Sequence, residues 1–299
     1  MDIAQQLVNG LTVGSIYALV ALGYTMVYGV LKMINFAHGD LFALGAYLAL
    51  TLFGVMTAAT QGSAWLALLV IALAVAAAVG AAGIVAERIA YRPLRDVGRL
   101  PPLVSALGVS VFLQNGIMLT WGARPRAFQH NLGLDAGLNL FGMRISPMQV
   151  IILLASLLLM IGLYLFVQRT KVGTAMRAIA VDHDTARLMG IDVNRIIQVV
   201  FMLGPALGGV AGMMVGLYYH QLNFTIGWSY GLKAFTAAIL GGIGNIPGAM
   251  LGGLVLGMAE ALAAGVSGQW KDAIAFVVLI VILVVRPTGL LGERVAEKI

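Results

Sequence analysis

The 299-residue sequence contains no cysteine and very few charged residues. Without cysteine, the chain has no disulfide bonds, no thiolate nucleophile and no metal site with cysteine ligands. Charged residues make up 10% of the sequence, whereas soluble domains carry about 25%, so they are too few to cover a water-facing surface. This shortage excludes a soluble enzyme and indicates an integral membrane protein.

Hydrophobic residues, by contrast, make up 61% of the chain, and there are 38 glycines. The hydrophobic residues lie in long continuous blocks and lack the apolar/polar alternation of barrel strands. Glycine lets membrane helices approach each other closely, where no aqueous hydrophobic effect drives them together. We therefore predict an all-α polytopic membrane protein with a single transmembrane domain over residues 1–299.

Charge-free runs locate the membrane-spanning helices, because a helix needs about 20 apolar residues to cross the bilayer core. They predict eight spans, at residues 7–30, 39–59, 64–86, 103–121, 148–168, 196–218, 247–266 and 271–286. A ninth apolar segment at 232–245 is too short for a comfortable crossing, so it is either a crossing or a re-entrant half-helix. The N-terminus has neither the basic region nor the cleavage site of a signal peptide, so the first span is expected to be retained.

Arginine-rich segments predict the orientation of these spans. Arginines gather in the loops 87–99 and 169–195 and in the tail after 286, and cytoplasmic loops carry such an excess. These segments are expected in the cytoplasm and the N-terminus outside, which also accounts for the net charge of +6 without a nucleic-acid partner. Two features fit less well: the loop 122–147, placed outside, contains three arginines, and the segment 232–245 must then cross.

Two short segments resemble each other. Residues 34–39 and 222–227 share an Asn-Phe pair, Asn35–Phe36 in the first and Asn223–Phe224 in the second. The predicted orientation places one pair near the inner surface and the other near the outer surface, as in an inverted-topology repeat with a pathway between its halves. A chance match of two dipeptides explains the likeness equally well.

The loop 169–195 is long enough to hold a short helix between two spans. Asp182 or Asp184 is suited to cap the N-terminus of such a helix, and Gly190 is suited to end it. A short amphipathic helix parallel to the membrane suits the docking of a soluble partner. The same pattern equally indicates a helix that lies on the lipid surface and binds no partner.

Ionisable side chains within membrane spans are costly and usually mark a pathway or an ion pair. Asn35 and His38 have two possible roles. They either contribute to a translocation pathway or form a cap at the membrane interface, with an ion pair among Lys32, His38 and Asp40.

A second set of ionisable residues lies near the C-terminal end of the sequence. For Glu260, in the predicted span 247–266, pairing with Lys233 or Lys271 is favoured over a proton relay. Lys233 itself begins the short segment 232–245, where it either meets a substrate carboxylate or extends its ammonium group to the membrane interface.

The glycine- and proline-rich run 241–248 cannot be ordinary helix, because both residues are unfavourable in a helix interior. We expect a broken helix beside the translocation route or a subunit seam, with a tight turn between two packed helices as the alternative. No Gly-Lys-[Ser/Thr] follows, which excludes a phosphate-binding loop. The widely spaced histidines and isolated serines predict no metal site, no cofactor and no catalytic residue.

Several blocks of the sequence resemble one family of transport proteins. Asp184-x-Ala186-x-x-x-Gly190 resembles the Glu-Ala-Ala-x-x-x-Gly coupling loop of ABC importer permeases, with Asp184 and Thr185 in place of the first two motif residues. Four further blocks resemble signatures of the branched-chain amino acid permeases, at residues 11–23, 34–40, 233–253 and 286–292. Together they resemble the H-type (LivH-like) permease subunit more than its longer M-type partner.

This resemblance implies a permease subunit of an ABC importer that carries out no chemistry itself. It implies three kinds of protein partner: a second, M-type permease subunit, two cytoplasmic ABC ATPase subunits and a periplasmic substrate-binding protein. It also implies a location in the bacterial inner membrane, in contact with lipid. The implied cargo is branched-chain amino acids, with urea or short amides as an alternative because related permeases carry them. A stand-alone channel or secondary transporter is the alternative from another class.

The resemblance also implies roles for individual residues. Coupling to the ATPase through a helix over 178–191 is assigned by motif position to Asp184, Ala186, Leu188, Met189, Gly190 and Ile191. The residues expected along the translocation pathway are Asn35, Phe36, His38, Asn223, Phe224, Lys233 and Thr236. In the coupling helix, small Ala186 and Gly190 would allow close seating in a groove on the ATPase, and Leu188 and Met189 would fill that groove.

Overall fold

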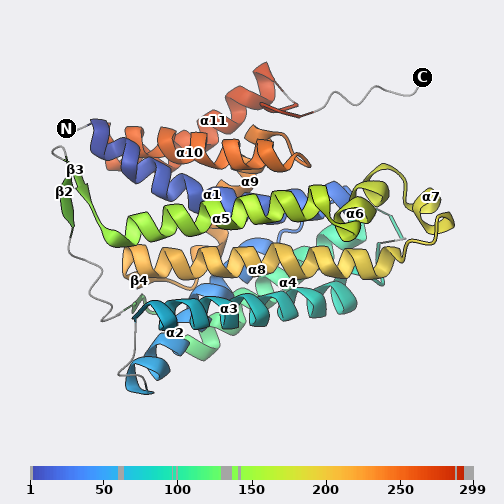
Figure 1. Ribbon diagram of the computed structural model, residues 1–299, viewed down its shortest axis with the longest axis horizontal. Helices are drawn as coiled ribbons and strands as arrows, with labels where there is room; N and C mark the ends of the chain where they lie inside the picture. Colours follow the sequence, from blue (N-terminus) through green and yellow to red (C-terminus); the bar gives the residue numbers. More distant parts are fainter. Residues whose placement is uncertain are drawn as a thin grey trace.

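The chain folds into a bundle of helices, in a computed structural model that describes residues 3–59, 64–95, 97–98, 100–128, 137–140, 143–286 and 288–292 (Figure 1). The long helices of this part of the chain are α1 (Ile3–Leu31), α2 (His38–Ala59), α3 (Ala64–Ala86), α4 (Leu100–Trp121), α5 (Pro147–Arg169), α8 (Val193–Tyr219), α9 (Ile226–Gly241), α10 (Ile246–Val266) and α11 (Lys271–Val285). The shorter helices are the π-helical turn η1 (Glu87–Tyr91), α6 (Lys171–Val181), α7 (His183–Leu188) and the 3₁₀ turn η2 (Gly268–Trp270).

Two small antiparallel sheets lie at one end of the bundle. Strand β1 (Arg126–Ala127) pairs with β4 (Gln221–Leu222), and β2 (Leu138–Leu140) pairs with β3 (Met143–Ile145). These strands are only two or three residues long, so the predicted all-α architecture is confirmed apart from them.

Seven helices within the described residues are long and apolar enough to cross a membrane, and they match the first seven predicted spans. The eighth predicted span, 271–286, forms α11, which has 15 residues and a length of about 22 Å, less than the roughly 30 Å of a bilayer core. The ninth segment, 232–245, is not an element of its own. Its first ten residues form the second part of α9, which begins earlier, at Ile226, and the remainder is a turn.

Helix α1 runs through the centre of the bundle, and its apolar surface is buried almost completely. It packs closely along α10, where glycines of the two helices face each other. A Cβ atom added to Gly14 would lie 2.9 Å from the Cα of Leu254, and one added to Gly10 would lie 2.8 Å from the Cα of Met258. Such a close approach of two backbones stabilises helix pairs in a lipid solvent, where the hydrophobic effect contributes little.

The glycine-rich run 241–248 forms a tight turn between two closely packed helices, rather than a broken helix. Helix α9 ends at Gly241, and α10 starts at Ile246 with the Asn245 side chain accepting a hydrogen bond from the Gly248 amide (2.9 Å). Gly242 and Gly244 have φ angles of 104° and 95°, a conformation that favours glycine. The turn is held further by Asn245, which donates to the carbonyl of Leu291 (2.8 Å).

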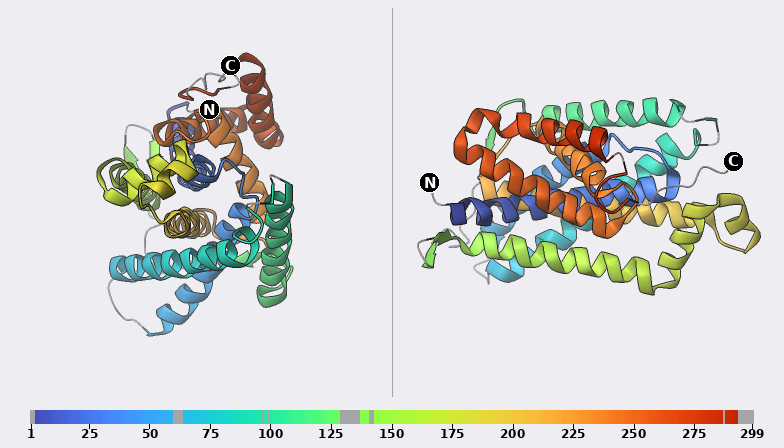
Figure 2. Two further views of the ribbon diagram at one scale, coloured as in Figure 1. Left: turned by 90° about the vertical axis from the view of Figure 1, so that its right-hand side faces the viewer. Right: turned by 90° about the horizontal axis from the view of Figure 1, so that it is seen from above.

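The two ends of the bundle differ in the segments that they carry (Figures 1 and 2). One end carries α6 and α7, the α9–α10 turn and residues 288–292, and it is called the α7 end below. The opposite end carries the start of α1, the four strands and η2. The arginine-rich loops 87–99 and 169–195 meet at the α7 end, where Arg95 donates to Asn194.

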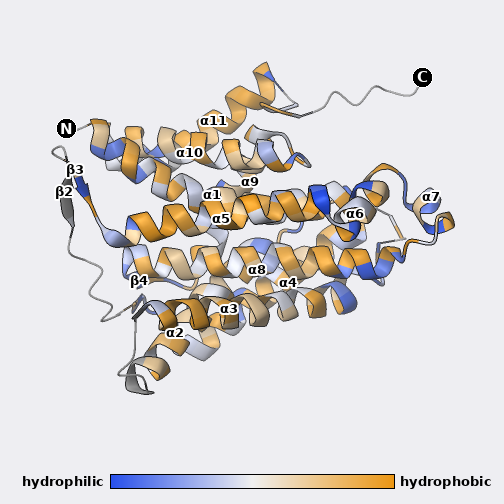
Figure 3. Cartoon of the chain, in the orientation of Figure 1, coloured by the Kyte–Doolittle hydropathy of each residue, from blue (hydrophilic) through white to orange (hydrophobic). Residues whose placement is uncertain are grey.

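The outer faces of the bundle are apolar, as Figure 3 shows along α5 and α3. Large hydrophobic side chains are exposed on these faces, including Leu73, Phe112, Leu119, Leu154 and Leu158. A surface of this kind is stable in contact with lipid, so the bundle is a polytopic membrane domain.

Candidate functional site

At the α7 end, the chain turns sharply from α5 into α6 (Figure 2). The Thr170 hydroxyl caps α6 by accepting a hydrogen bond from the Gly173 amide (3.0 Å). A Cβ atom on Gly173 would lie 2.6 Å from the carbonyl oxygen of Phe166, so this close turn requires glycine. Arg177 donates to the carbonyl of Val167 and thereby satisfies an acceptor at the C-terminus of α5. The start of α6 is therefore fixed to the end of α5.

The predicted coupling helix over 178–191 is wrong in its boundaries, because the chain breaks at Asp182. Helix α6 continues to Val181, and the Asp182 side chain then caps α7 by accepting hydrogen bonds from the amides of Asp184 (2.8 Å) and Thr185 (3.2 Å). Helix α7 is followed by Gly190 with a φ of 82°, as expected for a glycine that ends a helix. The result is an elbow of two short helices, which projects from the bundle in Figure 1.

The predicted coupling residues divide into an inner and an outer set on this elbow. Ala186 is 3% exposed, and its carbonyl accepts a hydrogen bond from the Ile191 amide (3.1 Å). Leu188 and Met189 are 87% and 78% exposed. His183, beside them, donates to the carbonyl of Val30 (2.9 Å) and so ties α7 to the end of α1. The remaining two predicted residues, Asp184 and Gly190, are also exposed.

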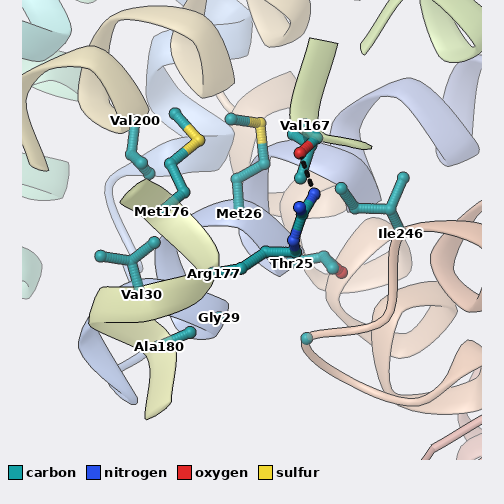
Figure 4. Close-up of a pocket in the computed structure, with 11 residues that line it drawn as sticks. Thr25, Met26, Gly29, Val30, Val167, Met176, Arg177, Ala180, Val200 and Ile246 are labelled. Carbon is teal, nitrogen blue, oxygen red and sulfur yellow. Dashed lines mark hydrogen bonds between the residues drawn. The ribbon is translucent and has the colours of Figure 1, made fainter. Parts of the chain in front are cut away.

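A cavity of about 80 Å³ lies beneath the elbow, between α1, α5, α6, α8 and the α9–α10 turn (Figure 4). Its lining is mainly apolar and includes Met26 and Val30 of α1 and Met176 of α6. Arg177, also in the lining, directs its guanidinium group to the carbonyl of Val167 (Figure 4). Because α6 forms one wall, a movement of the elbow changes the shape of this cavity.

Asn35 and His38 lie inside the bundle and not at an interface. Asn35 accepts hydrogen bonds from the Tyr91 hydroxyl (2.6 Å) and from the Ala37 amide (3.0 Å). His38 is fully buried and donates from Nε2 to the carbonyl of Val20 (3.1 Å), at the middle of α1. Its Nδ1 has no hydrogen-bond partner among the described residues.

The predicted ion pair among Lys32, His38 and Asp40 is wrong. Lys32 is exposed beyond the end of α1, and no ion pair joins it to either residue in the described part of the chain. The Asp40 carboxylate accepts instead from the hydroxyl of Ser110, a residue of α4. Asp40 thus connects α2 to α4.

The Tyr24 ring packs against His38, and further aromatic rings lie at the junction of α1, α2 and α9. The Tyr24 ring lies 4.8 Å from the His38 ring and 5.9 Å from the Phe235 ring. Phe36, predicted in the pathway, lies 6.3 Å from Phe235. The structure thus brings Phe36 and His38 together around α9 residues.

The other predicted pathway residues lie along α9 or just before it. Asn223 is exposed and Phe224 half-buried in the turn that leads from β4 to α9. Thr236 is buried and donates to the carbonyl of Leu232 (2.9 Å). Asn223 and Phe224 are therefore near the end opposite α7, whereas Asn35, by its bond to Tyr91 of η1, is nearer the α7 end.

Glu260 pairs with a lysine as predicted, and it does so with both candidates. Its Oε1 lies 2.8 Å from Lys233 Nζ and 3.3 Å from Lys271 Nζ, and its Oε2 accepts from the Tyr17 hydroxyl (2.7 Å). The Lys233 ammonium group also lies 5.8 Å from the centre of the Tyr17 ring. Lys233 is buried, so the alternative in which it extends to the membrane interface is wrong.

Comparisons with known proteins identify the family. Residues 6–283 match the family described as branched-chain amino acid transport system / permease component. The chain is 48% identical to the high-affinity branched-chain amino acid transport system permease protein BraD of Pseudomonas aeruginosa, over 99% of this chain and 97% of the relative. The chain belongs to this permease family. It is also 44% identical to the permease protein LivH of Escherichia coli K12, with the same coverage of both chains.

These matches confirm the resemblance found in the sequence blocks and make the chain a permease component of an ABC transport system, not its ATPase. A more distant relative is the ribose import permease protein RbsC of Escherichia coli K12, which is 27% identical over 93% of this chain and 84% of the relative. Relatives named for a sugar and for amino acids thus match nearly the same length of this permease.

Three side-chain contacts around these residues are not predicted by the sequence. Tyr17 binds Glu260 across 243 positions, Tyr91 binds Asn35 across 56 positions, and Arg177 closes the α5–α6 turn. The two tyrosines lie in apolar runs without a motif around them, so only their hydroxyl groups, which need a partner when buried, could have pointed to these contacts. Arg177 lies in the arginine-rich loop 169–195, where basic residues predict orientation in the membrane but not a bond to a particular carbonyl.

Proposed function

We propose that this permease translocates branched-chain amino acids into the cytoplasm of a bacterium by alternating access, together with a second permease subunit. Two cytoplasmic ABC ATPases would supply the energy, and a periplasmic binding protein would deliver the cargo. The names of relatives that are 48% and 44% identical over the whole chain support this cargo. The aromatic rings packed at the junction of α1, α2 and α9 suit contact with an apolar side chain.

The observation that carries the coupling proposal is the elbow of α6 and α7. Leu188 and Met189 present exposed apolar side chains at the end of α7, which projects beyond the bundle (Figure 1), and Val181 at the end of α6 is exposed as well. The arginine-rich loops at the same end favour the cytoplasmic side. An apolar knob on a short, capped helix fits a groove on a soluble partner better than it fits bulk water.

The elbow also has a mechanical connection to the membrane domain. Helix α6 forms one wall of the cavity beneath the elbow, and His183 of α7 is hydrogen-bonded to the end of α1. A displacement of α7 by the ATPase would therefore move a wall of this cavity and the end of the central helix. In this proposal, the cavity is part of the cytoplasmic exit.

The proposed pathway lies between α2 and α9, the helices that follow the two Asn-Phe pairs. Their first turns cross in close contact, because a Cβ atom on Gly227 would lie 2.7 Å from the carbonyl oxygen of Gly39. The chain reaches these two first turns from opposite ends of the bundle, which supports an inverted repeat. The Nδ1 of His38, near this crossing, has no hydrogen-bond partner within the described part of the chain, which supports a polar contact with the cargo along this pathway.

Co-purification tests the coupling proposal. With Leu188→Glu and Met189→Glu in one chain, the complex extracted in mild detergent should lose most of its ATPase subunits and its leucine uptake, because charge replaces the apolar contact. The matched control, Val266→Glu, adds a charge at an equally exposed site at the opposite end and should retain the ATPase subunits. Normal ATPase recovery with the double variant, or leucine transport by this chain alone, would overturn the proposal.

A further inference from the structure

Helix α4 combines the composition of a buried helix with the exposure of a helix that faces lipid. Only 17% of its apolar stretch is buried, the smallest share among the seven spanning helices of the described residues, whereas the share for α1 is 94%. Yet α4 is no more apolar than α1, and the two next least buried spans, α3 and α5, are much more apolar. Because polar side chains are costly in lipid, α4 is less apolar than its exposure requires.

Asn115 is the residue of α4 that lipid accommodates least. It is exposed and lies about 9 Å along the helix from the end at Trp121, which is inside a bilayer core about 30 Å thick. Its side-chain nitrogen donates to the carbonyl of Val111, one turn earlier (2.8 Å), whereas its Oδ1 has no donor in the part of the chain that the structure describes. An amide oxygen without a donor is costly in hydrocarbon, and a neighbouring helix can supply that donor.

The other side chains around Asn115 form a face for such a helix. Residues of α4 that recur every three or four positions share one face, and they are all exposed. We call them the α4 stripe: Val104, Gly108, Val111, Asn115 and Leu119. The buried residues Ser110 and Ile117 lie on the opposite face of α4. A Cβ atom added to Gly108 would meet nothing within 4 Å, so a second backbone can approach the stripe closely there.

We propose that the α4 stripe is the contact surface for the second permease subunit, and that a membrane helix of this subunit donates a hydrogen bond to Asn115. The proposal rests on the proposed function, which pairs this chain with a second, M-type permease. Among the proposed partners, only this subunit has helices at the depth of Asn115, because the ATPases are cytoplasmic and the binding protein is periplasmic. Helix α5 lies on the opposite side of the bundle (Figure 2), and its exposed side chains are apolar, as contact with lipid requires.

Photocross-linking identifies the molecule that covers the stripe. Benzoylphenylalanine incorporated at Val111, in membranes that contain the whole transporter, should form an adduct with the second permease subunit on irradiation. The same group at Leu158, an α5 position that is 70% exposed, should form none. An adduct of Val111 with lipid alone or with another copy of this chain would overturn the proposal. A subunit adduct of equal yield from Leu158 would overturn it as well.

Two glycines provide a matched pair of variants. Gly108 lies in the α4 stripe and Gly162 on α5, and a Cβ atom added to either would meet nothing within 4 Å. Gly108→Trp should lower the amount of second subunit that co-purifies with this chain in mild detergent about tenfold, because overpacking a tight contact costs about that much. Gly162→Trp should leave the amount unchanged.

Asn115→Leu tests the hydrogen bond itself. It should lower the recovery of the second subunit about threefold without lowering the amount of this chain in the membrane, because an interhelical hydrogen bond contributes about that much. Unchanged recovery with either Gly108→Trp or Asn115→Leu would overturn the proposal. If the unaltered chain does recover the second subunit, such a result counts against the stripe alone. If the unaltered chain recovers none, the result counts against the proposed function as well.

Discussion

At the scale of single residues, Glu260 of α10 connects its own helix to three others. Its carboxylate is 1% exposed and contacts Tyr17 of α1, Lys233 of α9 and Lys271 of α11. Removing one partner of a buried ion pair typically costs about 3–5 kcal/mol, because the remaining charge stays uncompensated. We therefore expect Glu260→Gln to lower the free energy of unfolding by about this amount, measured as a lower thermal midpoint in mild detergent.

The control for this measurement is Asp184→Asn, at a side chain that is 91% exposed. Surface changes of this kind usually stay within about 0.5 kcal/mol. If Glu260→Gln shifted the midpoint as little as Asp184→Asn, the contacts around Glu260 would contribute no net stability.

The pairing of Glu260 could be predicted from the sequence, because a carboxylate in an apolar span needs a cation and the neighbouring spans offer few. The role of Asn35 could not. Its partner, Tyr91, lies 56 positions away in a π-helical turn, and the Ser110–Asp40 bond joins residues 70 positions apart. Local patterns report which groups need partners, but only the packing of helices decides which partner is within reach.

At the scale of elements, the glycine faces of α1 and α10 define the centre of the bundle. Gly14→Leu would place a large side chain where a Cβ atom alone lies 2.9 Å from the Cα of Leu254. Overpacking of a tight contact costs about 1–3 kcal/mol or more, so this variant should separate the helices and lower both the yield and the thermal midpoint of the permease.

The matched control is Gly116→Leu, at a glycine of α4 whose added Cβ atom would meet nothing within 4 Å. Size-exclusion profiles in detergent should stay monodisperse for Gly116→Leu and become aggregated for Gly14→Leu. Equal profiles for the two variants would show that the α1–α10 contact tolerates large side chains.

The sequence predicted the long helices well, because continuous apolar runs are bounded by charges that mark where the membrane ends. It failed at the two elements whose bounds depend on other signals. Helix α9 starts at Ile226 in a segment that mixes polar and apolar residues, and the chain breaks at Asp182 because that side chain caps α7. The sequence indicates Asp182 as a helix cap, but the composition on its two sides is too similar to show that one helix ends before it and another begins after it.

At the scale of the whole molecule, hydropathy indicated a membrane bundle, but it did not give the order in which helices pack. The central position of α1 and the crossing of α2 with α9 follow from glycine contacts between segments far apart in the sequence. The glycines were visible in the sequence, and their partners were not. The arginine distribution did indicate one consequence of the fold, the meeting of loops 87–99 and 169–195 at one end.

Orientation in the membrane is the last property that this distribution predicts. Single cysteines at Leu188 and Val266 would stand at opposite ends of a chain without other cysteines, and both side chains are exposed. In intact cells, an impermeant maleimide should label Val266→Cys and leave Leu188→Cys unlabelled, because the positive-inside bias places α7 in the cytoplasm. In inside-out vesicles the pattern should reverse, and labelling of Leu188→Cys should rise further when the ATPase subunits are stripped away. Labelling of Leu188→Cys from outside would place the arginine-rich end on the wrong side for any cytoplasmic ATPase, and the elbow would then need another partner.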